Sequence, residues 1–449
     1  MIGKYGKVEE NTHAILWIYI TSITFALLLV VCLKPDESGG IAFLAFSGFL
    51  LYLFLVSRCQ RELKKIVLVA FFLRAALALV QAFAFSLPDS AMDAVYFEDT
   101  AWQMAELWRQ GEIVPLVTGA DFYPYILSFF YALFGRSQLI MQSVNVLCGS
   151  LTVYFTASAA RELFNRQASI IAGWLSCCFP VLLLYSVITM REAMLVALLS
   201  AGFWYLCRYL RTQRVLFAIV SVFLIFLAGL FHSGITILVI GPLLLLAARG
   251  MRYLLNLQVS SFIMFFIAGF LLLSVLYIPL SQGRGVEYLG SIDKLTQAET
   301  YQDKHHWVSQ QRAGYLPDLQ MTDIQDVIRA IPAKLLYFMY APLPWQVENM
   351  GDLLAAFDGL LFLLMTISII PGLREINRSY GRWTVITVIL MLGLGLLVYA
   401  MGSGNYGQAI RHRNKLSVIF IMLASFQLNY MIGHIKAKRS AKGARMQKV

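Results

Sequence analysis

The chain has 449 residues, of which 59% are hydrophobic and only 14% are charged. Soluble globular proteins carry roughly 25% charged residues, so this composition excludes an ordinary soluble fold. The formal charge of +11 would suggest nucleic acid in a soluble protein. Here the basic residues fall in the connections between apolar runs, and no nucleic-acid partner is expected.

Apolar runs close to a membrane's width recur from one end of the chain to the other. Such a run crosses a hydrocarbon core of roughly 30 Å, and it must be helical because lipid cannot satisfy bare backbone amides. The pattern predicts an all-α polytopic membrane protein with about twelve transmembrane helices. In chain order, the predicted spans are 13–33, 41–56, 66–86, 138–158, 168–187, 193–209, 215–231, 234–248, 260–279, 353–371, 383–402 and 416–434.

Basic residues set the predicted orientation of these spans. Every connection on one side is short and basic, which by the positive-inside rule makes that side and both termini cytoplasmic. Any chemistry is therefore expected on the opposite, outer face. The basic groups are Lys4 and Lys7; Arg58, Arg61, Lys64 and Lys65; Arg161 and Arg166; Arg208, Arg211 and Arg214; Arg249 and Arg252; Arg374, Arg378 and Arg382; and the tail from Lys436 to Lys448.

Two outer segments, 87–137 and 280–352, are long and rich in acidic residues. Loops of this length in a compact protein are usually functional. The apolar face of residues 97–110 predicts an amphipathic helix that lies at the membrane interface. Residues 122–134 are apolar and aromatic but too short to span comfortably, and residues 327–340 predict a further interfacial helix.

The spans and loops divide the chain into five predicted segments. They are two N-terminal spans (1–65), a membrane core that contains the first outer loop (66–280), the second large outer loop (281–352), three C-terminal spans (353–435) and a basic cytoplasmic tail (436–449).

Asp93 is the first candidate for chemistry, because it directly follows the third span. A carboxylate beside a hydrophobic wall can act as a general base or bind a divalent cation. Glu98 and Asp99 follow closely enough to join it. The alternative is that these are solvated loop acids or a helix N-cap, where Asp is favoured.

Arg191 and Glu192 lie at the outer end of the fifth span. Charges there are costly unless they are used or reach the interface. Arg191 could hold a phosphate, and Glu192 a metal ion or an acceptor hydroxyl; the alternative is a mutual salt bridge. His232, at the next outer turn, could donate to a phosphate or a sugar, or could be structural.

Arg411, His412 and Arg413 precede the last span on the predicted outer side, where basic residues are otherwise few. Arginine binds phosphate through a planar pair of donors, so these residues are candidate phosphate ligands. The alternative is an anchor for lipid headgroups. In the second outer segment, His305 and His306 are neighbours in the sequence but have no evident third ligand, so no metal site is expected there.

The string from Asp93 to Ala101 resembles the first-loop motif of GT-C-fold glycosyltransferases, which include family-39-like, ArnT-like and protein-mannosyltransferase-like enzymes. An acidic residue after a span is followed by an aromatic residue and then a small one. Further similar stretches follow in order, over roughly residues 66–250 and 383–434: Tyr123 to Gly135, Gln142 to Arg161, Ser186 to Glu192 and Arg411 to Arg413.

Two features depart from the usual pattern of that group. Two spans precede the candidate catalytic loop, where one is usual, and His232 stands where many relatives carry a basic residue. The arrangement of Arg191, Glu192 and His232 is also similar to EpsG-type and O-antigen polymerases.

The resemblance implies a GT-C-like fold and transfer of a sugar from a polyprenyl-(di)phosphate carrier to a glycan, lipid or protein acceptor. It implies an active site on the outer face of a bacterial inner membrane. Asp93, with Glu98 and Asp99, would be catalytic. The implied substrate-binding residues are Arg191, Glu192, His232, Arg411, His412 and Arg413, and the one candidate cofactor is a divalent cation, Mg²⁺ or Mn²⁺, held by Asp93 and Glu192.

Two other functions stay open at this point. One is a polysaccharide polymerase or ligase of related architecture. The other is a lipid-linked sugar transporter or flippase. Transporters often show internal repeats and carry ionisable groups near the middle of the membrane. Here no repeat is evident, and the only charges found well inside the predicted spans are Arg74 and Asp358.

Overall fold

The computed structural model describes residues 37–254 apart from 59, together with 302, 305–306, 309–310 and 312–446. Within these residues the regular structure is helical, and extended backbone pairs only at an isolated bridge between Gly314 and Asn405. The helices are α2 (Ser38–Arg58), α3 (Arg61–Phe83), α4 (Asp93–Arg109), α5 (Phe122–Phe134), α6 (Gln138–Leu163), α7 (Arg166–Cys178), α8 (Pro180–Leu184), α9 (Glu192–Thr212), α10 (Val215–Phe231), α11 (Ile240–Leu254), α15 (Ile324–Tyr340), α16 (Met350–Tyr380), α17 (Arg382–Gly402) and α18 (Tyr406–Met446), with 3₁₀ turns η2 (Gly119–Asp121), η3 (Ser233–Val239) and η4 (Pro344–Gln346).

The polytopic helical fold predicted from the sequence is confirmed. Seven helices in the described part are long and apolar enough to cross a membrane, namely α2, α3, α6, α9, α16, α17 and α18. Two further apolar stretches, Val215–Phe231 and Ser233–Arg249, are shorter. The predicted spans 13–33 and 260–279 lie outside the described residues, so the total of twelve stays a prediction.

The span predicted at 168–187 is not one continuous helix, because the chain breaks there into two short helices. α7 ends at Cys178, and α8 covers only Pro180–Leu184. Proline has no N–H to continue the helix and disfavours helical geometry in the residue before it. Phe179 accordingly has extended backbone angles, φ −65° and ψ 118°. The irregular turn that follows leads into α9 and forms part of the site described below.

Arg74, a charge inside span α3, is explained by this break. Its guanidinium donates to the carbonyls of Cys177 and Ser176, each at 3.3 Å. These carbonyls belong to the last turn of α7, where a helix leaves acceptors without intrahelical partners. The Arg74 side chain therefore caps the C-terminal end of α7, and it is fully buried.

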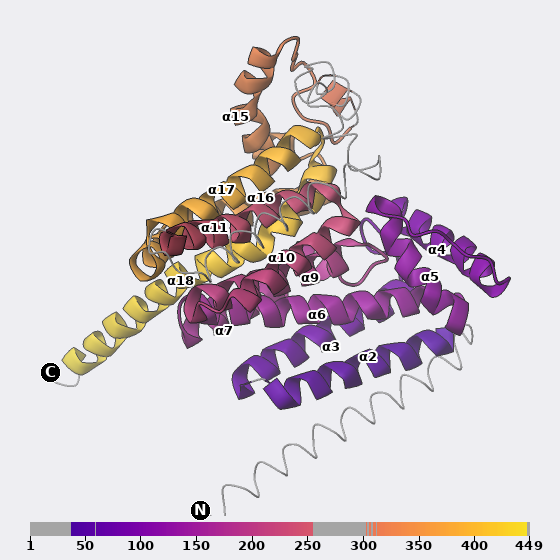
Figure 1. Ribbon diagram of the computed structural model, residues 1–449, viewed down its shortest axis with the longest axis horizontal. Coiled ribbons are helices and arrows are strands. Elements are labelled where there is room, and N and C mark those ends of the chain that lie inside the picture. Colours follow the sequence, from indigo (N-terminus) through magenta and orange to yellow (C-terminus); the bar gives the residue numbers. More distant parts are fainter. Residues whose placement is uncertain are drawn as a thin grey trace, which may run out of the picture.

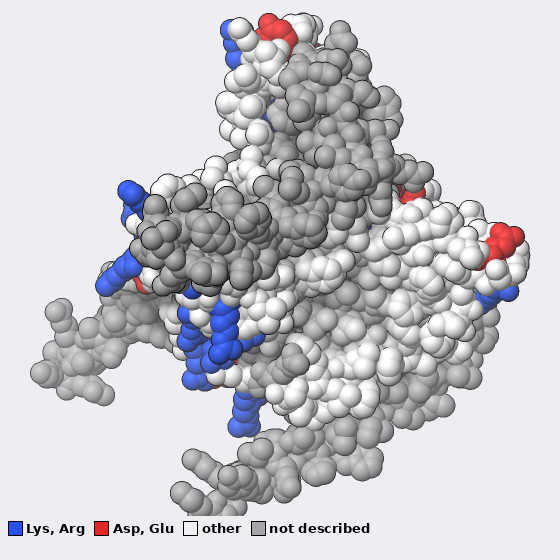
Figure 2. Space-filling view, in the orientation of Figure 1, with Lys and Arg blue, Asp and Glu red and all other residues white. Residues whose placement is uncertain are grey.

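The helices α2, α3 and α6 lie side by side in the bundle, and α6 also packs against α7 and α9 (Figure 1). The pair α4 and α5 lies together at one end of the bundle, while α15 stands beyond the ends of α16 and α17 (Figure 1). Most of the Lys and Arg visible in Figure 2 lie toward the end from which α18 extends, and the larger acidic groups lie at the tips of α4 and α15. This separation of charge follows the pattern predicted from the loops.

The helices predicted at 97–110 and 327–340 are present as α4 and α15, and the aromatic run 122–134 forms α5. The apolar face predicted for α4 is turned inward, with Phe97, Ala101 and Ala105 buried. Trp108 holds α4 against α5 through a 3.0 Å hydrogen bond from its indole nitrogen to Ser128. The segment 87–137 therefore contains a packed pair of helices.

The described part of the segment 280–352 is hydrogen-bonded to the start of α18. Tyr315 N donates to the Gly404 carbonyl at 2.9 Å, and Tyr406 N donates to the Ala313 carbonyl at 3.0 Å. Asp352, at the start of α16, accepts from Arg312 at 3.1 and 3.2 Å and from the Tyr406 hydroxyl at 3.1 Å. These bonds fix the first turn of α18, which carries Arg411 one turn further on.

Candidate active site

Arg411 and two carboxylates from the α3–α4 region meet at the end of the bundle near α4. The guanidinium donates from Nη1 to Asp93 Oδ2, across 318 positions of sequence. Its Nε lies 3.6 Å from Asp89 Oδ2. About half of the Asp93 side chain (51%) is exposed, and Arg411 is 26% exposed. A guanidinium and a carboxylate are thus adjacent at a place that a substrate can reach.

The short loop before α4 places both carboxylates. Leu87 N donates to the Gln81 side chain at 2.5 Å, and the Ser90 hydroxyl donates to the Leu87 carbonyl at 2.6 Å. Asp89 and Met92 have positive φ, 58° and 49°, which is uncommon for residues with a side chain. The turn lets α4 begin at Asp93, where the helix dipole favours a carboxylate.

Glu98 and Asp99 do not join Asp93 as predicted from their spacing. Both contact Arg136, at 3.3 Å and 2.5 Å. The reason is helical geometry, because five and six positions on a helix rotate the side chain by roughly 140° and 240° from Asp93. Burial raises the pKa of Glu98, and the bond from Arg136 opposes that rise. Their predicted catalytic role has no support in this geometry.

Arg191 and Glu192 form a weak mutual contact of 3.9 Å, but Glu192 has a second cationic neighbour that the sequence analysis did not pair with it. Lys415 Nζ lies 3.8 Å from the same carboxylate oxygen, and both side chains are almost completely buried. Arg191 also donates to the Phe231 carbonyl at 3.0 Å. Because ionisable groups in membrane helices usually pair, Glu192 and Lys415 could have been matched from the sequence.

His232 and His412 belong to one aromatic cluster with Tyr399. The His412 ring stacks on Tyr399 at 4.7 Å between centroids, and His232 lies 5.1 Å from His412. Lys415 Nζ is 2.9 Å from His412 Nδ1. The two histidines are therefore brought together, on the Lys415 side of α18. Their predicted contact with substrate stays a prediction.

The geometry around Arg413 does not support the substrate-binding role predicted for it. Its side chain is 0% exposed and pairs with Asp358 of α16 at 2.6 Å. Its Nη1 also donates to three carbonyls at the end of α15. Two positions on a helix differ by roughly 200° of rotation, so Arg413 points away from Arg411. The last span is predicted to begin at residue 416, whereas α18 begins at Tyr406, so both arginines lie on the helix and not before it.

The metal pair predicted from Asp93 and Glu192 has no further ligands in the structure. Across the described ranges, no three His, Cys, Asp or Glu side chains come together as a metal site would require. Asp93 contacts Arg411, whereas Glu192 faces Arg191 and Lys415. A role for Mg²⁺ or Mn²⁺ stays a prediction.

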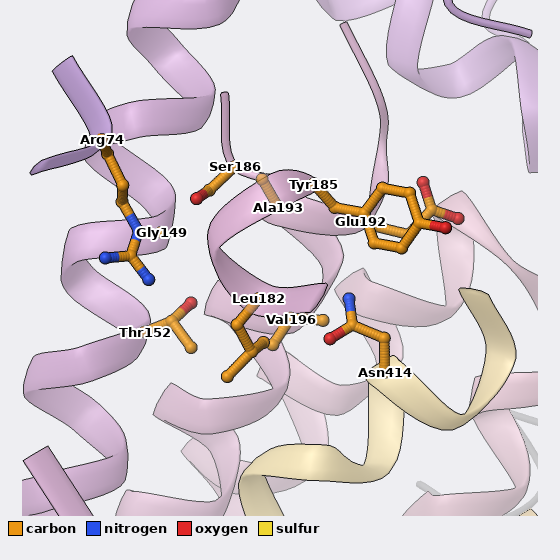
Figure 3. Close-up of a pocket in the computed structure, with 10 residues that line it drawn as sticks. All are labelled: Arg74, Gly149, Thr152, Leu182, Tyr185, Ser186, Glu192, Ala193, Val196 and Asn414. Carbon is orange, nitrogen blue, oxygen red and sulfur yellow. The ribbon is translucent and has the colours of Figure 1, made fainter. Parts of the chain in front are cut away.

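A small cavity lies behind these residues, with Glu192 and Tyr185 on one side and Arg74 on the other (Figure 3). Its volume of about 10 Å³ is near the minimum for one water molecule. Three buried polar atoms, Arg74 Nε, Glu192 Oε2 and Asn414 Oδ1, have no hydrogen-bond partner in the described part. The cavity is too small for a sugar, so a substrate has to approach Arg411 and Asp93 from the exposed side.

Residues 120–278 match the family model of dolichyl-phosphate-mannose-protein mannosyltransferases. The match covers about a third of the chain and includes Arg191, Glu192 and His232 but neither Asp93 nor Arg411. No curated protein matches the sequence in a direct comparison.

Three solved structures resemble the fold at low identity. ArnT from Cupriavidus metallidurans, bound to undecaprenyl phosphate, is 14% identical with a TM-score of 0.47, covering 82% of this chain and 59% of its own. An oligosaccharyltransferase of Archaeoglobus fulgidus in the apo form is 13% identical with a TM-score of 0.48, covering 85% and 51%. The oligosaccharyltransferase AglB from the same organism, in complex with an inhibitory peptide and a dolichol-phosphate, is 14% identical with a TM-score of 0.47, covering 86% and 52%.

The present chain thus spans between about half and three fifths of the length of those proteins. The family-model match, which begins just before α5 and continues past α11, confirms the predicted resemblance of this region to GT-C-fold glycosyltransferases.

Proposed function

We propose that the protein is a membrane glycosyltransferase that moves a hexose or pentose from a polyprenyl-(di)phosphate carrier to a hydroxyl of a glycan, lipid or protein. The observation that carries this proposal is the contact between Arg411 and Asp93 on a half-exposed surface. A guanidinium binds phosphate through two parallel donors, and an adjacent carboxylate can take a proton from an acceptor hydroxyl. The mannosyltransferase family match supports the class of donor.

The proposed reaction is a single displacement at the anomeric carbon. Asp93 accepts the proton of the acceptor hydroxyl while that oxygen bonds to the anomeric carbon. The bond between this carbon and the carrier phosphate oxygen breaks, and the phosphate leaves with the bonding electrons. Arg411 stabilises the negative charge that develops on the leaving phosphate. A displacement of this kind inverts the configuration of the sugar.

The surroundings of the site suit a donor whose tail stays in lipid. Met92 and Tyr96, on either side of Asp93 in the sequence, are 84% and 51% exposed although they are apolar or aromatic. Exposed apolar groups beside a polar site are typical of surfaces that meet a membrane. We place this site on the outer face of a bacterial inner membrane with both termini cytoplasmic, as the basic loops predict.

Turnover of a labelled polyprenyl-phosphate sugar by purified protein in lipid nanodiscs tests the proposal. We expect Asp93→Asn to lower the rate by about 10²–10⁴-fold, the usual contribution of a general base, without loss of folded protein. Glu106→Gln, which removes an exposed acid from the same helix, is the matched control and should keep the wild-type rate. Turnover by Asp93→Asn at nearly the wild-type rate would reduce Asp93 to a favourable helix N-terminal acid.

A further inference from the structure

Asp89, which accepts a hydrogen bond from Tyr185, forms a second contact to Arg411, separate from that of Asp93. The Tyr185 hydroxyl donates a 2.7 Å hydrogen bond to Asp89 Oδ2. The same oxygen is the one that lies 3.6 Å from Arg411 Nε, a charge contact longer than a hydrogen bond. That Nε is buried and has no hydrogen-bond acceptor in the part of the chain the structure describes. Asp89 is therefore the nearest fixed charge to this edge of the guanidinium.

Tyr185 is held rigidly enough to fix its partner. Its side chain is buried, with the residue 1% exposed, and its backbone N donates to the Val181 carbonyl at 3.1 Å in the turn that follows α8. In Figure 3 the ring lies along the cavity wall with its hydroxyl directed away from Arg74. The break at Pro180 thus puts a buried ring behind the site and only its polar tip against Asp89.

The backbone at Asp89 has a conformation that needs support. Its φ of 58° is one that residues with side chains rarely adopt, although Asp tolerates it better than most. Such positions persist where surrounding contacts hold them, and they cluster at functional sites. Here the hydrogen bonds at Leu87 and the bond from Tyr185 supply that support.

The two carboxylates differ in what they can do. Asp89 Oδ2 is already shared between Tyr185 and Arg411. Asp93 is the more exposed of the two side chains, 51% against 39%. Of its two carboxylate oxygens, Oδ2 accepts from Arg411. Asp93 can therefore meet an acceptor hydroxyl, whereas Asp89 is suited to holding the guanidinium still.

We propose that Asp89 and Tyr185 are positioning residues that orient Arg411 for the carrier phosphate, an inference that rests on the proposed function. Held at its Nε edge, the guanidinium directs its terminal nitrogens toward Asp93. A phosphate bound there lies beside the carboxylate that activates the acceptor. Without Asp89 and Tyr185, Arg411 keeps its charge but loses its fixed orientation, and a planar donor pair depends on orientation.

The test compares Tyr185→Phe with wild type in the turnover assay, with the donor titrated. Phenylalanine keeps the ring and removes the hydroxyl, so we expect a donor KM about tenfold higher, equivalent to ~1.4 kcal/mol, with kcat unchanged. Asp89→Asn should raise the donor KM in the same direction. Tyr131→Phe is the matched control, because its buried hydroxyl has no hydrogen-bond partner in the described structure, and it should behave as wild type.

A double-mutant cycle separates positioning from a general structural effect. If Tyr185 acts through Arg411, Tyr185→Phe should change the donor KM little when Arg411 is already lysine. Full additivity of the two substitutions, or a wild-type donor KM in Tyr185→Phe, would overturn the positioning role of Tyr185 and Asp89. A wild-type donor KM in Arg411→Lys alone would instead remove the phosphate site of the proposed function, so the two failures are distinguishable.

Discussion

Replacing Arg413 with methionine should destabilise the protein strongly, because it leaves Asp358 charged and buried. The pair lies between α18 and α16, where the Arg413 and Asp358 side chains are 0% and 3% exposed. The guanidinium also donates to the carbonyls of Phe338, Met339 and Ala341, which end α15. Removing one partner of a buried ion pair costs about 3–5 kcal/mol. We expect a loss of that size, together with looser packing of α15.

Thermal unfolding of purified protein in nanodiscs measures this effect. Arg136→Met is the control, because its pair with Asp99 is exposed and such pairs contribute only about 0.2–1 kcal/mol. The double variant Asp358→Leu/Arg413→Met should recover much of the lost stability, since it leaves no uncompensated charge in the bundle. If Arg413→Met unfolds at the wild-type temperature, or loses donor binding while its stability is unchanged, the structural role argued for Arg413 is refuted.

Three further outcomes are expected. Arg411→Lys should cost about 1–3 kcal/mol, the usual loss for a charge-assisted bond, seen as weaker donor binding or slower turnover. Arg136→Lys, whose side chain contacts Glu98 and Asp99 of the same helix α4, should have no such effect. Burial and the nearby Lys334 lower the pKa of His305 below 6.5, so folding favours the neutral ring, and stability should fall as pH drops through 6.5 in wild type; in His305→Gln this part of the pH dependence should vanish. A cysteine at position 62 should react with labels only from the cytoplasmic side, and labelling from outside would contradict the topology and the outer-face mechanism with it.

The apolar spans could be predicted because the signal for them is local. A run of about twenty apolar residues predicts its own helix. Each of the seven long spans overlaps a predicted one, although the last begins ten residues earlier than predicted. The sequence signal for α4, α5 and α15 is equally local, and α5 has the bounds of its aromatic run, 122–134. Pro180 is the local signal for the break at Phe179, but it lies inside an apolar run long enough to predict a single span.

The partners of the charged residues could be predicted only in part. Asp358 and Arg74 were recognised as charges inside spans, and such charges must be neutralised or hydrogen-bonded. The partner of Asp358 is Arg413, which a search for an opposite charge at a similar depth would have suggested. Arg74 has carbonyl partners instead, and these become available only because α7 ends at Cys178. The partners of Arg74 therefore cannot be predicted as long as residues 168–187 are read as one unbroken span.

The different roles of Arg411 and Arg413 follow from where α18 begins. If residues 405–413 were a loop, both arginines could face one ligand, and their common charge would make them equivalent. Because the helix starts at Tyr406, fastened through Ala313 and Asp352, the two side chains leave it in nearly opposite directions. One enters the bundle and pairs with a buried acid, and the other reaches the carboxylates before α4. A helix start therefore decides which arginine stabilises the fold and which remains available for a phosphate.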